Sequence, residues 1–397
     1  MRLRFSHVAL TALVAAPAWS LQVSVPDSTT KLDIGVLMQN RAEMNASENA
    51  AGKEFDVNRG KTAVADPIDF YGRRARLSVK LERNSWTGFI MFSADNTDST
   101  STDGNRNPKL LYLWAQNKLT SQGLTHTFTL GLDKAHAQPS FDDPSSQLLF
   151  PTTRATALYP TPKPAYGIRY QMGAKNFEVS ADVQNTHNAE RATVTEAEGL
   201  FYAGRVVFAP VGSLTKRMES YAGEPGKSLA IGIDGTFDPE EIMVDPAGNG
   251  TAKTTDDTVS AAHITFGADL LAHYGPVTAI VDARFQNFVR PTNTIQSQVI
   301  TGQIGYAIPT GSLVVEPAVR FAIIDKDVDN TDADKKLLNY SSSANSEHGN
   351  SGYEGDIGVN LYFRKHANKV QIAFSRWESE NSDAFANILR VQHQLNF

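Results

Sequence analysis

The sequence predicts an all-β fold of about sixteen antiparallel strands, and three observations support that prediction. Apolar and polar residues alternate along the last stretch, 384–397, and along many stretches before it. Helical periodicity is nearly absent from the chain. Tight turns alternate with longer polar connections. A period of two places apolar side chains on one face of a strand and polar side chains on the other.

The last stretch shows this alternation most clearly. From Leu389 to Phe397 the odd positions are mostly apolar, and the even positions are the polar residues Arg390, Gln392, Gln394 and Asn396. The chain ends on an aromatic residue. Taken alone, this pattern fits the closing strand of a barrel as well as the edge strand of a soluble sandwich. The barrel and the sandwich can be distinguished only from the rest of the chain.

Residues 1–20 predict a secretory signal peptide, followed by a single domain at 21–397. Arg2 and Arg4 precede a short apolar run at 8–16, and small residues for cleavage follow Pro17. That run is too short for a membrane-spanning helix, and no later apolar run reaches the roughly eighteen residues that such a helix needs. The chain has no cysteine, which excludes disulfides and thiol-based metal or redox chemistry. We therefore expect an exported protein.

The charge balance is mildly acidic, with 37 basic against 43 acidic residues, and this argues against a nucleic-acid-binding surface. The mean hydropathy of −0.31 is too low for a helical membrane protein. It suits a transmembrane barrel, because such a barrel has apolar residues at every second strand position and polar groups in its interior and loops.

The strands are assigned from the alternating runs and the turns between them. The predicted strands are 31–41, 70–82, 86–94, 110–119, 124–134, 165–173, 177–186, 198–210, 228–238, 259–274, 277–290, 295–308, 313–324, 352–364, 369–378 and 384–397. Short turns such as Asn84-Ser85 join them at one end, and polar loops such as 45–66, 95–107, 239–257 and 325–351 join them at the other. An even number of such strands predicts a bacterial outer-membrane β-barrel. The last strand of such a barrel has to end on the periplasmic side. Because the number of strands is even, we expect both termini and the short turns to lie in the periplasm.

The connection 137–164 differs from the other loops. It is long and rich in proline, and it carries the apolar residues Leu148, Leu149 and Phe150. We interpret it as an inward-folded constriction loop; a cover over the barrel mouth or a subunit contact is the alternative. The candidate constriction residues are Asp142, Asp143, Phe150, Arg154 and Lys163.

The direction of the charged side chains follows from the membrane. A Lys or Arg that faces the middle of the bilayer costs roughly 2–4 kcal/mol in a barrel, so charged strand positions should face the interior. In the strand 70–82, Leu77 and Val79 then face lipid. The candidate pore-lining and anion-guiding residues are Arg74, Arg76, Lys80, Arg154, Arg284, Arg320 and Arg390. The same rule places further charges inside: Arg41, Arg169, Arg205, Arg364, Asp33, Asp133, Glu178, Asp182, Asp269, Asp282, Glu316 and Asp356. The alternative is that these cations pair with interior carboxylates and only solvate the wall.

The run 70–77, FYGRRARL, resembles the arginine-rich strand of the phosphate-selective porin O and P family. Residues 130–134 and 138–141 are similar to the strand and proline turn that enter that family's constriction loop. The resemblance implies a trimeric sixteen-stranded barrel that passes anions and, in some members, selects phosphate. It places Arg74 and Arg76 in an arginine ladder. The constriction loop departs from a dense cationic site, because Asp142 and Asp143 accompany its basic residues.

One weaker motif lies in the acidic loop. Asp325, Asp327 and Asp329 have the spacing of the first ligands of a calcium loop, but Asn330 replaces the glycine and Lys336 the last glutamate. This leaves a solvated acidic loop or a loosely bound divalent cation. The scattered histidines predict no structural metal, and we expect no cofactor.

Together these patterns predict an outer-membrane porin for passive diffusion of small ions or hydrophilic, anionic solutes, with an anion or phosphate preference. The expected partners are the lipid bilayer, lipopolysaccharide and two further copies in a homotrimer, but no nucleic acid. No G-x-S-x-G or phosphate-binding glycine loop is present, so the chain is not expected to be an enzyme. A barrel with a hydrolase, adhesin or anchor role is the alternative. The sequence identifies neither the preferred solute nor the trimer interface.

Overall fold

The structure is a computed structural model. It describes residues 21–24, 29–48, 68–94, 108–135, 148–152, 164–185, 199–214, 222, 226–244, 258–289, 294–325, 351–380 and 385–397. The predicted signal peptide and the candidate residues Asp142, Asp143, Arg154 and Lys163 lie outside these ranges. Within the described part of the chain, no helix is long and apolar enough to cross a membrane.

The described residues form β-strands almost throughout. The strands are β1 (Leu21–Ser24), β2 (Thr30–Glu48), β3 (Ile68–Arg83), β4 (Trp86–Ser93), β5 (Lys109–Ser121), β6 (Leu124–Asp133), β7 (Ala165–Gly173), β8 (Phe177–Asn185), β9 (Leu200–Val211), β10 (Gly226–Val244), β11 (Thr258–Gly275), β12 (Val277–Val289), β13 (Thr294–Tyr306), β14 (Ile308–Thr310), β15 (Leu313–Asp325), β16 (Gly352–Tyr362), β17 (Asn368–Ser379) and β18 (Phe385–Asn396).

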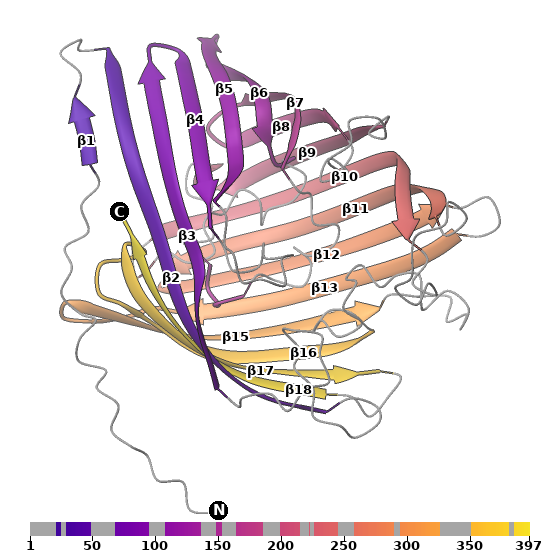
Figure 1. Cartoon of the computed structure of the whole chain (residues 1–397). Coiled ribbons are helices and arrows are strands. Elements are labelled where there is room, and N and C mark those ends of the chain that lie inside the picture. Colours follow the sequence, from indigo (N-terminus) through magenta and orange to yellow (C-terminus); the bar gives the residue numbers. More distant parts are fainter. Residues whose placement is uncertain are drawn as a thin grey trace, which may run out of the picture.

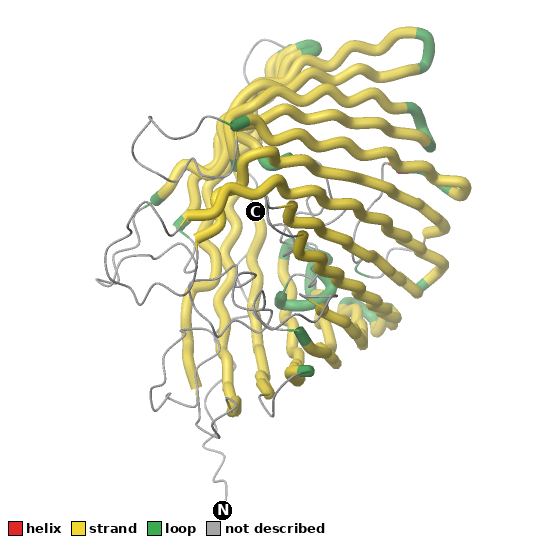
Figure 2. The backbone as a smooth tube through the Cα atoms, turned by 90° about the vertical axis from the view of Figure 1, so that its right-hand side faces the viewer, coloured by secondary structure: helices red, strands yellow, loops and turns green. Residues whose placement is uncertain are grey.

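These strands close into a barrel. Each long strand pairs antiparallel with its neighbours in the sequence, and β18 pairs with β2 to close the sheet (Figure 1). Two of the eighteen strands are short additions, because β1 extends the sheet beside β2 and β14 continues β13 after Ala307. Sixteen strands therefore form the closed wall, which confirms the predicted fold class and strand number. Figure 2 shows this wall as one continuous curved sheet.

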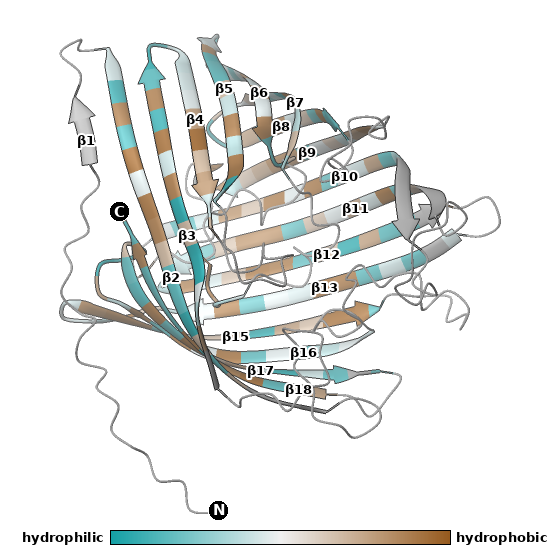
Figure 3. Ribbon diagram, viewed as in Figure 1, coloured by the Kyte–Doolittle hydropathy of each residue, from teal (hydrophilic) through white to brown (hydrophobic). Residues whose placement is uncertain are grey.

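The two faces of the wall differ in polarity, as the alternation predicts. On β12, Val281 and Phe285 are exposed on the outer face, whereas Asp282 and Arg284 are buried on the interior face. Figure 3 shows the resulting alternation of hydrophobic and hydrophilic residues along the strands. The same order holds on β15, where Val319 is exposed and Arg320 is buried. The amphipathic strands thus give an apolar exterior and a polar interior.

Tight turns fix the register of several hairpins. Gln122 and Gly123 both have positive φ, 52° and 79°, between β5 and β6. Two consecutive positive φ angles match the right-handed twist of the flanking strands, and glycine takes the second position without strain. Asn84, with φ 53°, begins the turn between β3 and β4. Both turns were predicted from the sequence.

Three local predictions were wrong. Residues 45–48 and 239–244 were assigned to loops but belong to the ends of β2 and β10. Proline normally ends strand pairing because it has no backbone N–H to donate. Pro239 lies where the register of β10 shifts against β11, and no backbone N–H donor is needed at such an irregularity. Arg364, predicted on the interior face, lies instead in the exposed connection 363–367 after β16.

Candidate functional site: the interior wall of the barrel

The interior wall of the described strands carries three clusters of ion-paired arginines. The smallest centres on Arg169 of β7. Its Nε donates to Asp182 Oδ1 on β8 at 2.8 Å, and its Nη2 donates to Asp133 Oδ2 on β6 at 2.7 Å. Nη2 also donates to the backbone oxygen of Lys134 at 2.7 Å. One guanidinium therefore joins three neighbouring strands, and both of its carboxylate partners were predicted to face the interior.

A second cluster spans β9 to β12. Arg205 Nη1 donates to Asp234 Oδ2 at 3.0 Å and to Asp269 Oδ2 at 2.7 Å, and its Nη2 donates to Asp269 Oδ1 at 3.1 Å. Arg284 Nη1 donates to the other oxygen of Asp234. The Asp234 side chain has no exposed surface and is shared by two arginines. A buried carboxylate of this kind is stable only while its partners remain, because an unpaired buried charge is costly.

Two glycines make the second cluster possible. Gly232 and Gly267 face the interior on β10 and β11, within the same rows of the sheet as the charged residues. A Cβ atom at Gly232 would lie 2.5 Å from Arg205 Nη2, and one at Gly267 would lie 2.8 Å from Asp234 Oδ1 and would overlap Arg284 Nη1. Because glycine has no side chain, both guanidinium groups lie flat across the wall and reach carboxylates on neighbouring strands.

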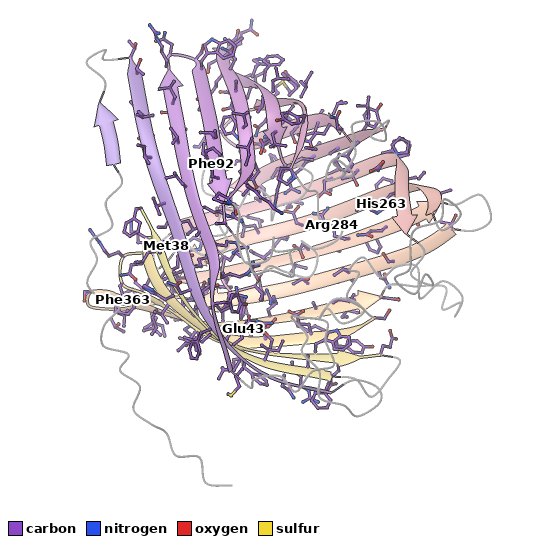
Figure 4. All side chains as sticks on the ribbon, in the orientation of Figure 1. Met38, Glu43, Phe92, His263, Arg284 and Phe363 are labelled. Atoms are coloured by element: carbon purple, nitrogen blue, oxygen red, sulfur yellow. The ribbon has the colours of Figure 1, made fainter. Side chains whose placement is uncertain are left out.

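The third cluster runs from β2 to β15 and includes the closing seam. Glu43 Oε1 accepts from Arg41 Nη1 and from Arg390 Nε, both at 3.0 Å. Arg390 Nη1 donates to Ser375 Oγ at 2.8 Å, and Ser375 Oγ in turn donates to Asp356. The chain of contacts ends at Arg320, described below. Glu43 of β2 and Arg284 of β12 thus belong to different parts of the wall (Figure 4).

Arg320 of β15 completes this third cluster. Its Nε donates to Asp356 Oδ2 at 2.6 Å, and its Nη2 donates to Glu354 Oε1 at 3.0 Å. Its guanidinium carbon lies 4.8 Å from the centre of the Phe150 ring. Arg320 therefore connects two carboxylates of β16 to the segment 148–152, which belongs to the connection between β6 and β7.

The segment 148–152 lies against the interior wall at β15, β16, β17 and β2. Lys369 Nζ donates to Leu148 O at 2.8 Å, and Asn360 Nδ2 donates to Leu149 O at 2.9 Å. Arg41 Nη2 donates to Pro151 O at 2.5 Å. Arg320 Nη1 and Nη2 donate to the backbone oxygen and Oγ1 of Thr152 at 3.1 and 2.8 Å.

Apolar packing adds to these hydrogen bonds. Leu149 and Phe150 are buried against the interior side chains Ala318 of β15 and Ala373 of β17. Small residues at these wall positions leave room for the leucine and the aromatic ring. The apolar side chains that distinguish this connection in the sequence therefore pack inside the barrel. Of the five candidate constriction residues, Phe150 is the one that lies in the described part of the chain.

The column on β3 differs from the three clusters. Arg74 is buried and donates from Nη1 to Gln39 Oε1 at 2.9 Å. Lys80 pairs with Glu82 on the same strand, and the two side chains remain 40% and 35% exposed. Arg76 lies between Arg74 and Lys80 on the same face of β3 and is partly exposed. By contrast, Arg284, Arg320 and Arg390 are almost fully buried in their clusters.

Several interior charges were missed from the sequence. Asp234 and Glu354 follow the same alternation as the predicted interior residues on their strands, so the pattern contained the signal. Glu43 fell beyond the predicted end of its strand, although it lies two residues after Arg41 on the same face. Lys369 was assigned to a strand, but its buried contact with Leu148 has no local signal. No group of three metal-ligating side chains occurs among the residues that the structure describes.

No protein-family model matches the chain, and no curated protein matches it in sequence. Solved structures do match in fold. OmpT, an outer membrane protein of Vibrio cholerae, is 12% identical with a TM-score of 0.57, over 96% of this chain and 100% of that one. OmpF of Salmonella typhi in complex with daunomycin is 13% identical with a TM-score of 0.56, over 94% and 100%.

The outer membrane channel DcaP of Acinetobacter baumannii is 11% identical with a TM-score of 0.52, over 94% of this chain and 98% of that one. At such identities the likeness concerns the fold, and it extends over nearly the whole chain. The resemblance to the phosphate-selective subtype stays a prediction from the arginine-rich strand. The chain thus has the sixteen-stranded fold that is found in outer-membrane channel proteins.

Proposed function

We propose that the protein is a channel of the bacterial outer membrane through which small hydrophilic solutes diffuse passively. The observation that carries this proposal is the contrast between the two faces of the closed barrel. Large apolar side chains such as Phe285 and Ile357 are exposed on the outer face, where lipid would cover them. Charged and polar side chains line the interior, where water and solutes would contact them.

The proposed location follows from the same contrast. An outer face of this kind requires lipid, and a barrel satisfies all backbone hydrogen bonds within its wall, which a bilayer demands. Export by the signal peptide 1–20 would deliver the chain to the periplasm. Lipopolysaccharide and phospholipid are then the partners of the outer face.

We further propose a homotrimer. One solved structure of Vibrio cholerae OmpT, similar in fold, is a trimer form. The outer wall here has an apolar groove of about 810 Å³ between β3 and β7, lined in part by Val79, Leu113 and Ile168, which a lipid chain or another copy would fill. Chemical cross-linking in native outer membranes tests the proposal: a trimer band supports it, and monomer alone contradicts it.

The segment 148–152 is proposed to narrow the channel. It comes from the connection between β6 and β7, yet its backbone oxygens bond to β15, β16, β17 and β2 on other parts of the wall. A connection held inside a barrel takes up part of its cross-section. This supports the constriction-loop interpretation over a cover at the barrel mouth.

An anion preference is proposed to come from Arg76 and Lys80 of β3. Both are partly exposed on the interior face, so passing anions can reach them. Arg284, Arg320 and Arg390 are proposed to hold the wall together instead, because they are buried and their charges are balanced by adjacent carboxylates. The anion-guiding interpretation thus applies to Arg76 and Lys80. The alternative, pairing with interior carboxylates, applies to Arg284, Arg320 and Arg390.

Single-channel recording of the purified protein in a planar bilayer tests the channel. Discrete current steps in potassium chloride support it. Folded barrel that gives no steps refutes it and favours an anchor, an adhesin or a hydrolase.

The reversal potential under a salt gradient tests the anion preference. We expect an anion-selective potential that falls in the double variant Arg76→Gln and Lys80→Gln. Lys227→Gln is the matched control, because Lys227 is exposed on the outer face beside Tyr274. A cation-selective potential, or one unchanged by the β3 substitutions, contradicts the proposal.

A further inference from the structure

Three aromatic side chains form a patch on the interior face of β4 and β5. Phe89, Tyr112 and Trp114 lie on the face opposite to the exposed outer residues Phe92 and Leu113. The Phe89 and Trp114 rings are stacked, with centroids 5.1 Å apart and planes 25° apart, and the Tyr112 centroid lies 6.4 Å from that of Phe89. We call Phe89, Tyr112 and Trp114 the aromatic shelf.

The shelf is more exposed than three other aromatic residues of the interior face. Phe201, Tyr362 and Trp377 also face the interior, but they are at most 6% exposed because neighbouring side chains cover them. The three rings of the shelf remain partly exposed. An apolar face that lies on the shelf would be held there, because both apolar surfaces then lose their contact with water.

The row of the sheet that contains Phe89 and Trp114 explains this exposure. On one side, the register partners of Trp114 are Gly131 of β6 and then Gly167 of β7, neither of which has a side chain. A Cβ atom at Gly131 would lie 2.7 Å from the Trp114 Cα atom, so glycine is required at this position. No side chain therefore stands beside the indole ring in that row.

On the other side, the register partner of Phe89 is Lys80 of β3. Its ammonium group pairs with Glu82, and both side chains are partly exposed. Ion pairs in contact with water contribute little to stability, so the carboxylate of a solute can replace Glu82 at small cost. Opposite residues on neighbouring strands have Cβ atoms about 5 Å apart, so the Lys80 side chain lies next to the Phe89 ring.

We propose that the aromatic shelf and Lys80 form a binding site for small carboxylates that carry an aromatic ring. The ring would stack on Phe89 and Trp114, and the carboxylate would pair with the Lys80 ammonium group. The inference rests on the proposed function, because the site would bind solutes as they pass through the channel. It goes beyond a general anion preference, because it distinguishes anions of equal charge by their ring.

Saturation-transfer NMR on the detergent-solubilised full-length protein tests the site, with benzoate as the probe and acetate as the anion without a ring. We expect saturable transfer to benzoate and none above background to acetate. Phe89→Ala and Trp114→Ala should each raise the dissociation constant of benzoate about two- to tenfold, the factor for one lost stacking contact. Lys80→Gln should raise it up to about fivefold.

The matched control is Phe92→Ala, which removes the same side chain from the outer face of the same strand (Figure 4). We expect no change in benzoate binding from it. Equal transfer to benzoate and acetate, or equal weakening by Phe92→Ala and Phe89→Ala, overturns the inference. The NMR measurement needs no conduction, so a barrel that conducts chloride but ignores benzoate contradicts the site alone. A barrel that binds benzoate without conducting contradicts the channel alone.

Discussion

The close approach of Arg284 to Gly267 leads to a sharp prediction about stability. In Gly267→Ala, the new methyl group would overlap Arg284 Nη1 and lie 2.8 Å from Asp234 Oδ1. The guanidinium group has to rotate away, and it loses its bond to Asp234. A hydrogen bond between charged groups contributes about 1.5–3 kcal/mol. Replacing a strand glycine by alanine gains roughly 0.5–1 kcal/mol from backbone entropy.

The control is Gly302→Ala on β13, where nothing lies within 4 Å of the new Cβ atom. The backbone gain is the same in both variants, so their difference isolates the displaced arginine. We expect Gly267→Ala to be less stable than Gly302→Ala by about 1.5–3 kcal/mol. The assay is guanidinium unfolding of the barrel in lipid vesicles, followed by tryptophan fluorescence. Equal stability of the two variants would show that the ion pair does not depend on the bare glycine, and would refute the reasoning.

Three further predictions follow from the wall. Asp234→Asn leaves Arg284 buried without its carboxylate and should cost about 3–5 kcal/mol in the same assay; adding Arg284→Gln should recover part of this loss, and no recovery would contradict the pairing. Lys369→Met removes one of the donors that hold the segment 148–152, so open-channel current noise should rise; unchanged noise would argue against this anchor. Ile357→Lys places a charge on the outer face and should cost about 2–4 kcal/mol in vesicles; a neutral effect would place that face away from lipid.

The strands were predictable because their signal is local. Alternation along β18 or β12 requires only that one face is covered differently from the other, and a period of two records this directly in the sequence. The direction of Arg284, Arg320 and Arg390 followed from the same rule. Errors occurred at strand ends such as 239–244, which were assigned to a loop although the sheet accommodates Pro239 at a register shift.

The partners of the interior charges were not predictable, because they depend on long-range register. Arg205 meets Asp269, which is 64 residues away, and Arg320 meets Thr152, which is 168 residues away. Whether a cation stays accessible to solutes depends on how its neighbours on other strands bury it. Burial separates Arg284 from the partly exposed Arg76 and Lys80, and it is set by the folded barrel.

As a channel, this barrel would enclose a water-filled passage for small solutes. Osmotic swelling of vesicles that contain the folded protein tests it directly, with uncharged sugars of increasing size as solutes. We predict swelling rates that fall steadily as the sugar becomes larger, since the segment 148–152 narrows the passage. Vesicles that swell no faster with the smallest sugar than protein-free vesicles would contradict the claim.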